Sequence, residues 1–439
     1  MKKRILIENV TVVPMVSAAE PYYNASVGIE DNKIVLICRS GDSAQRFKTE
    51  TDADVTVIDG RGRVLMPGLI NIHTHASMTL LRGYADDYEL MDWLNNYIWP
   101  FEAKLQSEDY RSGVRLAIAE MLMGGTTTML DMYFNEDLIA QEVVAGGMRG
   151  WLGTSFLRSP HEKYCEELDR VGALLAKPEY STVKSVIAPH APYTVSDENL
   201  KWTHAEAARR GVLLHIHLAE TLDEQKIIAD KCGLSPVEYC HKLGILDKNT
   251  IAAHCVHLSQ KDMDIMAECG VSVAHNPQSN MKLASGISPV VQMLKSGINV
   301  GLGTDGASSN NDLDMWEEMR SASLLQKVNV GDPCVIPAYE LLRMATVGGA
   351  KAIGRGDELG QIKEGMLADM IVIDMEKPHL YPRYDVVANL AYAAKASDVD
   401  MVVVNGEVLV DGGKVLGVDE MDLCRRVEKR AKELDAMAK

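Results

Sequence analysis

Apolar runs of strand length alternate with helix-like segments along the middle of the chain. Eight such runs, rich in β-branched residues, are each followed by polar residues and then by apolar residues at helical spacing. They lie at 69–75, 126–133, 149–157, 183–193, 212–220, 250–258, 271–278 and 299–306. A (β/α)8 barrel contains eight strand–helix units and takes about 250 residues. The pattern therefore predicts an α/β protein built on such a TIM barrel, with a doubly wound open sheet as the alternative.

The position of the polar residues favours the barrel. Nearly every run ends in His, Asp or Glu at its carboxyl end, and five of the runs carry histidine there. Loops at the carboxyl ends of the strands build the active site of such barrels. Two of the helix-like segments, 107–125 and 196–211, start at a serine that can cap a helix.

Short β-rich runs separated by turn residues occupy both ends of the chain. Residues 4–68 contain several of them. Similar runs follow after about residue 361, separated by Asn-Gly, Asp-Gly and Gly-Gly turns. We expect the two ends to pair into a small β-sandwich domain. The predicted domains are thus 1–67 with 361–439, and the barrel at 68–360.

Composition and charge narrow the class of partner. The 439 residues are 46% hydrophobic and 24% charged, which is typical of a globular protein with a sizeable core. The net charge of −17 argues against nucleic acid or an anionic membrane, since both would repel the chain. No run approaches the ~18 apolar residues of a membrane span, and the eight cysteines form no CxxC pair. We expect a cytoplasmic protein with reduced thiols and a small-molecule substrate; a homo-oligomer is compatible with these data.

Three histidines and one aspartate form a candidate metal site. His73 and His75 are two positions apart on a predicted strand, so their side chains share a face. His217 and Asp305 occupy the ends of the fifth and eighth strands, and the eighth strand of a barrel closes beside the first. Such ligands suit one divalent ion, Zn²⁺ or alternatively Fe²⁺.

Two further histidines leave alternatives open. His215 alternates with His217 and could bind the metal instead; we favour His217 because Glu220 then follows at the position of a general acid/base. His254, at the end of the sixth strand, could bind a second metal or polarise the attacking water. Binuclear sites of this kind generally need a bridging lysine carbamate or carboxylate on the fourth strand, which here ends in APHAPY. We therefore predict a single metal with His254 as its helper.

The segment from Gly301 to Gly306 matches the GxGxxG pattern of dinucleotide-binding loops. It belongs to the eighth strand and not to the first of a βαβ unit, and Asp305 would stand where the pyrophosphate must bind. We interpret the match as a coincidence.

A family resemblance emerges when the segments are taken in order. The chain contains PGLINIHTHASM, HIHLAE, AAHCVHL, HNPQSNMKLASGISPV and GLGTDGASSNN. Together they resemble the amidohydrolase superfamily, in its cytosine-deaminase and chlorohydrolase-like branch, from about residue 68 to 360. Residues 86–105, DDYELMDWLNNYIWPFEAKL, are similar to the ribose-recognising segment of 5-methylthioadenosine/S-adenosylhomocysteine deaminases.

The resemblance implies hydrolytic deamination of an adenine nucleoside, giving the inosine analogue and ammonia. The substrate would be 5-methylthioadenosine, S-adenosylhomocysteine or adenosine. Deamination of another aminopurine or a pterin, for example guanine, and dechlorination of a triazine are the enzymatic alternatives. A metal-binding barrel that has lost its chemistry is the non-catalytic one.

The resemblance also implies roles for individual residues. Glu220 matches the acid that protonates the purine ring nitrogen, and His254 matches the group that polarises the attacking water, with Asp305 beside it. Glu102, in WPFE, matches the carboxylate that accepts both ribose hydroxyls. His190, in APHAPY, matches a further substrate contact.

The far end of the substrate is less well defined. Arg158 lies in the loop region of the arginines that hold the homocysteine carboxylate, but Thr154 stands where some relatives carry arginine. Trp93, Trp99 and Met78 could line an apolar pocket for a thioether, although their helical spacing favours a place in the core.

Overall fold

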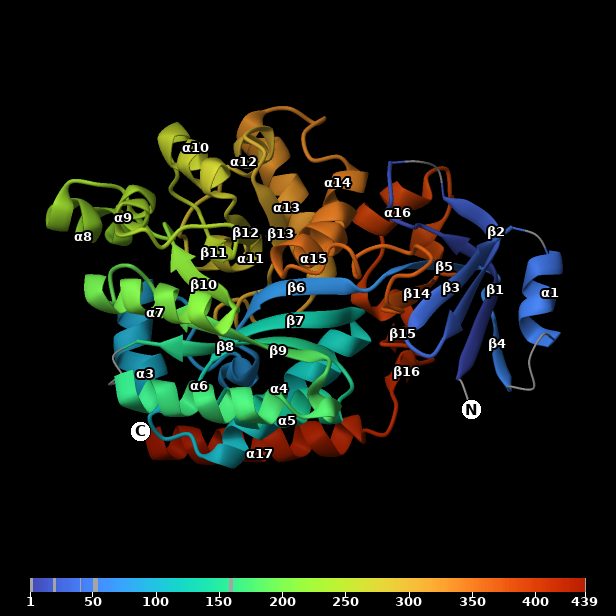
Figure 1. Cartoon of the computed structure of the whole chain (residues 1–439), viewed down its shortest axis with the longest axis horizontal. Coiled ribbons are helices and arrows are strands. Elements are labelled where there is room, and N and C mark those ends of the chain that lie inside the picture. The colour runs from blue at the N-terminus through green and yellow to red at the C-terminus, as the bar shows by residue number, and fades with distance from the viewer. Residues whose placement is uncertain (1–2, 19–20, 40, 50–53, 158–160, 439) are drawn as a thin grey trace.

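A closed barrel of eight parallel strands forms the centre of the molecule (Figure 1). The structure is a computed structural model that describes residues 3–18, 21–39, 41–49, 54–157 and 161–438. The strands, which neighbour one another in chain order, are β6 (Leu69–Thr74), β7 (Thr126–Tyr133), β8 (Arg149–Phe156), β9 (Val183–Pro189), β10 (Leu213–Leu218), β11 (Thr250–His254), β12 (Ser272–His275) and β13 (Asn299–Leu302). The backbone N–H of Asp305, just after β13, donates to the carbonyl of His73 at 3.0 Å and joins the last strand to the first. The predicted barrel is confirmed, and the open sheet is excluded because the strand order never reverses.

Helices surround the barrel and connect its strands (Figure 1). The helix predicted at 196–211 is capped as expected, because the N–H of Asn199 donates to Oγ of Ser196 at 3.3 Å. The one predicted at 107–125 is capped one residue earlier than expected, at Gln106. Among the described helices, none is both long and apolar enough to cross a membrane. The helices of this part of the chain are α2 (Leu90–Trp93), α3 (Trp99–Glu102), α4 (Ser107–Met123), α5 (Glu136–Ala145), α6 (His161–Leu175), α7 (Asp197–Arg210), α8 (Leu222–Cys232), α9 (Pro236–Leu243), α10 (Gln260–Cys269), α11 (Pro277–Lys282), α12 (Val290–Lys295), α13 (Met315–Val330), α14 (Ala338–Arg343) and α15 (Gly349–Ala352).

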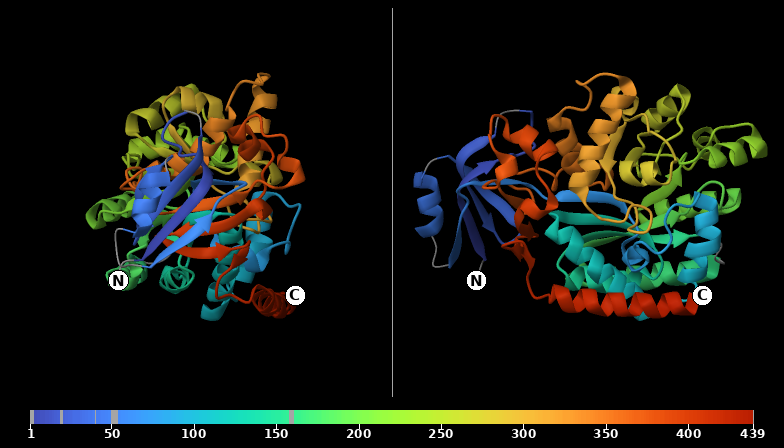
Figure 2. Two further views of the ribbon diagram at one scale, coloured as in Figure 1. Left: turned by 90° about the vertical axis from the view of Figure 1, so that its right-hand side faces the viewer. Right: turned by 180° about the vertical axis from the view of Figure 1, so that it is seen from behind.

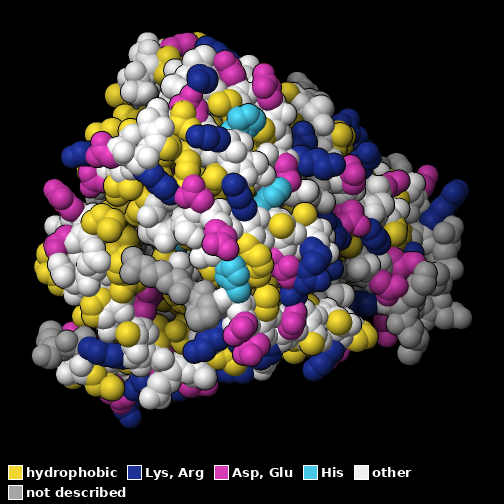
Figure 3. Space-filling model, turned by 60° about the vertical axis from the view of Figure 1, so that its left-hand side comes forward, with side chains coloured by type: hydrophobic (Ala, Val, Ile, Leu, Met, Phe, Trp, Pro, Cys, Tyr) yellow, Lys and Arg dark blue, Asp and Glu magenta, His cyan; other side chains and the backbone are white. Residues whose placement is uncertain are grey.

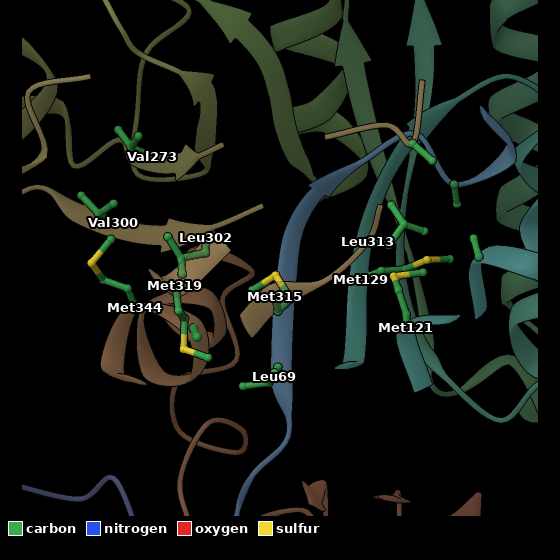
Figure 4. Close-up of a cluster of buried hydrophobic side chains, with 14 of the residues drawn as sticks. Leu69, Met121, Met129, Val273, Val300, Leu302, Leu313, Met315, Met319 and Met344 are labelled. Atoms are coloured by element: carbon green, nitrogen blue, oxygen red, sulfur yellow. The ribbon is translucent and has the colours of Figure 1, made fainter. Parts of the chain in front are cut away.

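Methionines fill much of the layer between the strands and the helices. Figure 4 shows Met121 and Met129 to one side of β6 and Met319 and Met344 to the other, among Leu and Val side chains of neighbouring elements. All four are fully buried. The unbranched thioether adapts to irregular gaps, so these side chains pack around the junction where β13 closes against β6.

The glycines of β13 serve this closure. A Cβ on Gly303 would lie 2.7 Å from Cβ of His73 and 2.5 Å from Oδ1 of Asn276, and one on Gly301 would lie 2.7 Å from Cδ1 of Ile72. No side chain fits between the two strands at such distances. The GxGxxG match therefore reflects close packing of strands.

A second, mixed sheet is built from both ends of the chain (Figure 2). N-terminal strand β5 pairs antiparallel with C-terminal strand β14, from Arg63–Asp374 to Pro67–Met370. Helix α1 (Gly41–Thr49) lies beside it, whereas α16 (Val386–Tyr392) packs against α13 and α14 of the barrel. The strands run in the order β17 (Lys414–Val415), β16 (Glu407–Asp411), β15 (Val399–Val404), β14 (Met370–Asp374), β5 (Arg63–Pro67), β1 (Arg4–Val12), β2 (Tyr22–Glu30) and β3 (Lys33–Cys38), with β4 (Val55–Asp59) also paired to β1. The expected pairing of the two chain ends is confirmed.

The last helix leaves this sheet and lies along the barrel. Figures 1 and 2 show α17 (Glu420–Ala438) running beside the barrel helices. It packs on α4, where Nε of Arg430 donates to Oδ1 of Asp109 at 2.6 Å. The exact domain boundaries at 67/68 and 360/361 stay a prediction.

A buried ion pair joins the barrel to the second sheet. Nε of Arg149, the first residue of β8, donates to Oδ2 of Asp369 at 2.5 Å, and Nη2 donates to Oδ1 at 3.0 Å. Nη2 also donates to Oδ1 of Asn405 at 2.7 Å, and the N–H of Asn405 donates back to Asp369. Both charged side chains are about 5% exposed, so the pair depends on its geometry to offset desolvation.

We expect Arg149→Met to destabilise the protein by about 3 kcal/mol, because it leaves the Asp369 carboxylate buried without its partner. Thermal unfolding followed by circular dichroism measures the change. Arg61→Met, which breaks an exposed pair with Asp59, is the matched control and should cost less than about 1 kcal/mol. Equal losses in the two variants would contradict the special role of the buried pair.

Candidate active site

A cavity of about 760 Å³, counting its opening to solvent, lies at the carboxyl ends of the barrel strands. Its walls include the side chains of His75, His217, Glu220, His254 and Asp305, each at or just after the end of its strand. Figure 3 shows the side of the molecule toward which these strand ends point, with a hollow bordered by hydrophobic side chains. The structure thus brings the sequence-predicted strand-end residues into one site.

The four predicted metal ligands converge at the bottom of this cavity. Nε2 of His73 and Nε2 of His75 lie 3.3 and 3.2 Å from the same carboxylate oxygen, Oδ1 of Asp305. Nε2 of His217 lies 3.4 Å from Nε2 of His75. His73, His75 and Asp305 form one group of possible metal ligands, and His73, His217 and His254 form another that overlaps it. The cluster is suited to a metal ion.

Hydrogen bonds on the far side of each ring set which nitrogen faces the cluster. Nδ1 of His75 donates to the carbonyl of Met132 at 2.6 Å, and Nδ1 of His217 donates to the carbonyl of His190 at 2.8 Å. Each ring is therefore protonated on Nδ1 and, when neutral, presents the lone pair of Nε2. This is the arrangement that metal-ligating histidines normally adopt.

His215 orients His73 in the same way. Nδ1 of His215 donates to the carbonyl of Ile251 at 3.1 Å, which leaves its Nε2 free to accept from Nδ1 of His73 at 2.8 Å. His215 is fully buried on β10 and does not line the cavity. Of the two histidines in HIHLAE, His217 therefore faces the cavity, and His215 supports the ring of His73.

The protonation states of the cluster favour a bound cation. Burial lowers the pKa of His73 to about 4 and that of His217 well below its usual value, so both rings are neutral at pH 7. Burial opposes ionisation of Asp305, but its contacts with the rings of His73 and His75 outweigh that effect and hold the carboxyl pKa well below its ordinary value. Burial also opposes the charge on His75, yet the bond to Asp305 raises its pKa to about 9. His75 therefore carries a positive charge at pH 7 beside the ionised Asp305.

A buried nitrogen without a hydrogen-bond partner in the described part of the chain, Nε2 of His73, indicates whether these residues could bind a metal. Nε2 of His73 is buried and receives no hydrogen bond from the described residues, while Oδ1 of Asp305 faces it at 3.3 Å. Two acceptors in this position repel unless a cation or a proton lies between them. Three imidazoles and a carboxylate are a donor set for Zn²⁺ or a similar first-row ion, so the residues fit.

Asp305 is held rigidly from behind. Its second carboxylate oxygen, Oδ2, accepts hydrogen bonds from Oγ of Ser279 at 2.6 Å and Oγ of Ser309 at 2.9 Å. Its backbone has φ +61°, and His254 has φ +71°, a region that non-glycine residues rarely adopt. Such strain persists where surrounding contacts enforce it, and here it turns both side chains toward the cavity.

Glu220 and His254 face each other across the cluster. Oε2 of Glu220 lies 3.9 Å from Nε2 of His254, whose Nδ1 lies 2.9 Å from Oδ1 of Asn280. Burial raises the pKa of Glu220, which favours the protonated form that a general acid needs. Glu224 accepts the backbone N–H of Glu220 at 2.8 Å and fixes this loop.

The cavity wall also contains Glu102 and several apolar side chains. Oε1 of Glu102 accepts a hydrogen bond from the hydroxyl of Tyr133 at 2.5 Å. His190 also lines the cavity, and burial lowers its pKa to about 4. The segment after β6 contributes apolar side chains to this wall, namely Met78, Leu90, Trp93, Leu94, Ile98 and Trp99.

The sequence made predictions about an apolar pocket and about an arginine that binds an acidic tail. Trp93 and Met78 belong to the buried core, as their spacing favours, but both also line the cavity together with Trp99. Arg158, the candidate for binding an acidic tail, lies outside the described residues. Thr154 is fully buried on β8 and does not line the cavity.

Sequence reasoning missed the residues that hold the site together. These are Ser279 and Ser309 behind Asp305, Asn280 behind His254, Glu224 under Glu220 and Tyr133 beside Glu102. Ser279 and Asn280 belong to HNPQSNMK, where polar residues directly after a strand end are a usable signal. Tyr133 also ends a predicted strand, but nothing in the sequence indicates that it pairs with Glu102, 31 positions earlier.

Comparison with known proteins adds independent findings. A model of the Amidohydrolase family matches residues 64–409. The chain is 45% identical over 433 residues to the 5-methylthioadenosine/S-adenosylhomocysteine deaminase of Pelotomaculum thermopropionicum, covering 98% of each chain. It is 46% identical over 434 residues to the 5'-deoxyadenosine deaminase of Methanosarcina barkeri, again covering 98% of each.

Solved structures are similar over the full length as well. An adenosine deaminase from Xanthomonas campestris with bound zinc superposes with a TM-score of 0.94 at 34% identity, covering 98% of each chain. An atrazine chlorohydrolase from Arthrobacter aurescens, complexed with zinc, superposes with a TM-score of 0.85 at 26% identity, covering 98% of this chain and 100% of that one.

We expect His215→Phe to lower the affinity for Zn²⁺ by roughly 10- to 100-fold, because His73 loses the acceptor that fixes its ring. Competition with a chromophoric chelator measures the affinity. His204→Phe is the control, since His204 lies on α7 outside the barrel and its ring bonds Asp247. A folded His215→Phe protein with unchanged affinity would show that His215 does not orient the ligand.

Proposed function

The chain belongs to the amidohydrolase family, and from this we propose that it is a metal-dependent aminohydrolase that deaminates adenine nucleosides. The products would be the inosine analogue and ammonia. The substrates we propose are 5-methylthioadenosine, 5'-deoxyadenosine, S-adenosylhomocysteine and adenosine. The observation that carries the proposal is the convergence of a His/Asp metal cluster, an acid and a separate carboxylate on one cavity.

We assign one divalent ion per chain, Zn²⁺ in preference to Fe²⁺, to His73, His75, His217 and Asp305. The zinc in two structurally similar proteins supports this choice of metal. A second ion would need a bridging carboxylate or modified lysine, and the carboxyl end of β9, at Pro189 and His190, offers neither. His254 then remains available as a base.

The bound cation supplies Lewis-acid activation, which makes water a nucleophile near neutral pH. His254 and Asp305 orient the water and take one proton as its oxygen bonds to C6 of adenine. Glu220 donates a proton to the adjacent ring nitrogen, so that negative charge does not accumulate on the ring. The C6–amine bond then breaks, and the amine leaves as ammonia with the proton first taken from water. The remaining hydroxyl proton restores Glu220 as C6 becomes a carbonyl.

The cavity can hold the rest of a nucleoside in an extended line. With the purine at the metal end, Glu102 would accept the two ribose hydroxyls and His190 would contact the substrate. The 5' end would lie against the apolar wall that includes Trp93 and Trp99. That wall suits a methyl or methylthio group, because burying apolar surface there is favourable without a charged partner.

We expect Glu220→Gln to keep the metal and lose roughly 10²-fold or more in kcat, because the amide cannot donate the ring proton. Ammonia release with 5-methylthioadenosine measures turnover, and metal analysis of the same sample measures occupancy. Asp223→Asn, which removes an exposed carboxylate three residues away, is the matched control. A fully active Glu220→Gln enzyme would remove Glu220 from the mechanism.

The substrate assignment is tested by ammonia release from zinc-loaded protein, with and without chelator, on four nucleosides, free adenine, guanine and atrazine. We expect chelator-sensitive release from the nucleosides, with higher kcat/KM for 5-methylthioadenosine and 5'-deoxyadenosine than for S-adenosylhomocysteine. Release from a free base or the triazine alone would keep the metal site and discard the ribose assignment. Efficient use of S-adenosylhomocysteine that is lost in Arg158→Ala would assign the acidic tail to Arg158.

A further inference from the structure

The end of β7 contacts two parts of the site at once. The carbonyl of Met132 accepts Nδ1–H of His75 at 2.6 Å, and the hydroxyl of the next residue, Tyr133, donates to Oε1 of Glu102 at 2.5 Å. Asp131 precedes Met132, and its Oδ1 accepts the backbone N–H of Ala76 at 2.8 Å. Three consecutive residues therefore link the proposed metal ligand His75, the turn after it and the Glu102 carboxylate in the cavity wall.

Tyr133 is itself firmly placed. Its side chain is 3% exposed, and its ring lies against those of Tyr110 and Phe134, with centroids 5.8 and 5.5 Å away. Its backbone N–H donates to Oε1 of the buried Glu136 at 3.1 Å. Burial holds the pKa of the Tyr133 hydroxyl well above its ordinary value, so at neutral pH this group is a hydrogen-bond donor.

Glu102 depends on this hydroxyl. Within the described part of the chain, Tyr133 is the one hydrogen-bond donor to its side chain. Glu102 is the last residue of the short helix α3, and its flexible side chain would otherwise sample several rotamers. The bond engages Oε1 and leaves Oε2 available to a ligand in the cavity.

We propose that Tyr133 is a positioning residue for the ribose: its hydroxyl fixes Glu102 so that the remaining carboxylate oxygen accepts the 2'- and 3'-hydroxyls. The inference rests on the proposed function, in which Glu102 meets the ribose. Because Tyr133 and Met132 are adjacent, the β7 backbone also sets the spacing between the ribose carboxylate and His75. A nucleoside that fits this spacing places its C6 at the metal cluster.

Pre-organisation of this kind affects substrate binding more than the chemical step. Without the Tyr133 hydroxyl, the carboxylate must be ordered by the substrate itself, which weakens binding. Hydrogen bonds to charged groups contribute about 1.5–3 kcal/mol, so a change of tenfold or more is measurable. The loss should appear only with substrates that carry the ribose diol.

The experiment compares Tyr133→Phe, Glu102→Gln and the double variant on adenosine and on 2',3'-dideoxyadenosine, which share the same 5' end. For Tyr133→Phe we expect KM for adenosine to rise about tenfold with kcat changed less than twofold. KM for dideoxyadenosine should stay unchanged. The double variant should be no worse than Glu102→Gln alone, because Tyr133 acts through Glu102.

Tyr110→Phe is the matched control. It removes a hydroxyl from the neighbouring buried ring, which makes no hydrogen bond to Glu102, so its kinetics on both substrates should match the wild type. Equal losses of Tyr133→Phe on the two nucleosides, additive effects in the double variant, or a fall in kcat alone would overturn the proposal. A wild-type enzyme that deaminates only free bases would instead overturn the proposed function.

Discussion

The closure of β13 against β6 is the constraint on which the site depends. The backbone bond from Asp305 to His73 places the last strand of the barrel beside the first. It thereby brings one carboxylate oxygen within reach of two histidines that lie 230 residues or more earlier in the chain. Gly303 makes this approach sterically feasible, since any side chain there would overlap His73. A chain that failed to close at this seam would not assemble the metal cluster.

Burying the imidazoles and the carboxylate that meet where β13 closes against β6 costs free energy. Buried imidazoles lose their charge, and buried carboxylates resist ionisation, so the cluster needs support from outside. The second layer provides it through carbonyl oxygens, the imidazole of His215 and the hydroxyls of Ser279 and Ser309. A cation held by the His/Asp cluster would complete the arrangement. Metal affinity and local order are therefore coupled.

Sequence reasoning succeeded where a regular pattern carries the information. Strand period and helix spacing gave all eight barrel strands, and parallel geometry then required that His217 and Asp305 meet His73 at one end. Sequence reasoning failed for contacts between side chains whose positions in the chain follow no regular spacing. The bonds of Tyr133 to Glu102 and of Arg149 to Asp369 span 31 and 220 positions and depend on rotamers that only the packed fold determines.

Chemistry and recognition occupy different parts of this fold. The His/Asp cluster, Glu220 and His254 stand at or just after barrel strand ends, which the closed sheet holds in place. The apolar wall and Glu102 stand on the connection between β6 and α4, a run of short helical pieces with no place in the barrel itself. Since a fold alone does not choose a substrate, differences in this connection can redirect the same metal site to another ring. The hydrogen bond from Tyr133 to Glu102 joins this connection to β7, so under the proposed function it would hold the substrate at a set distance from the His/Asp cluster.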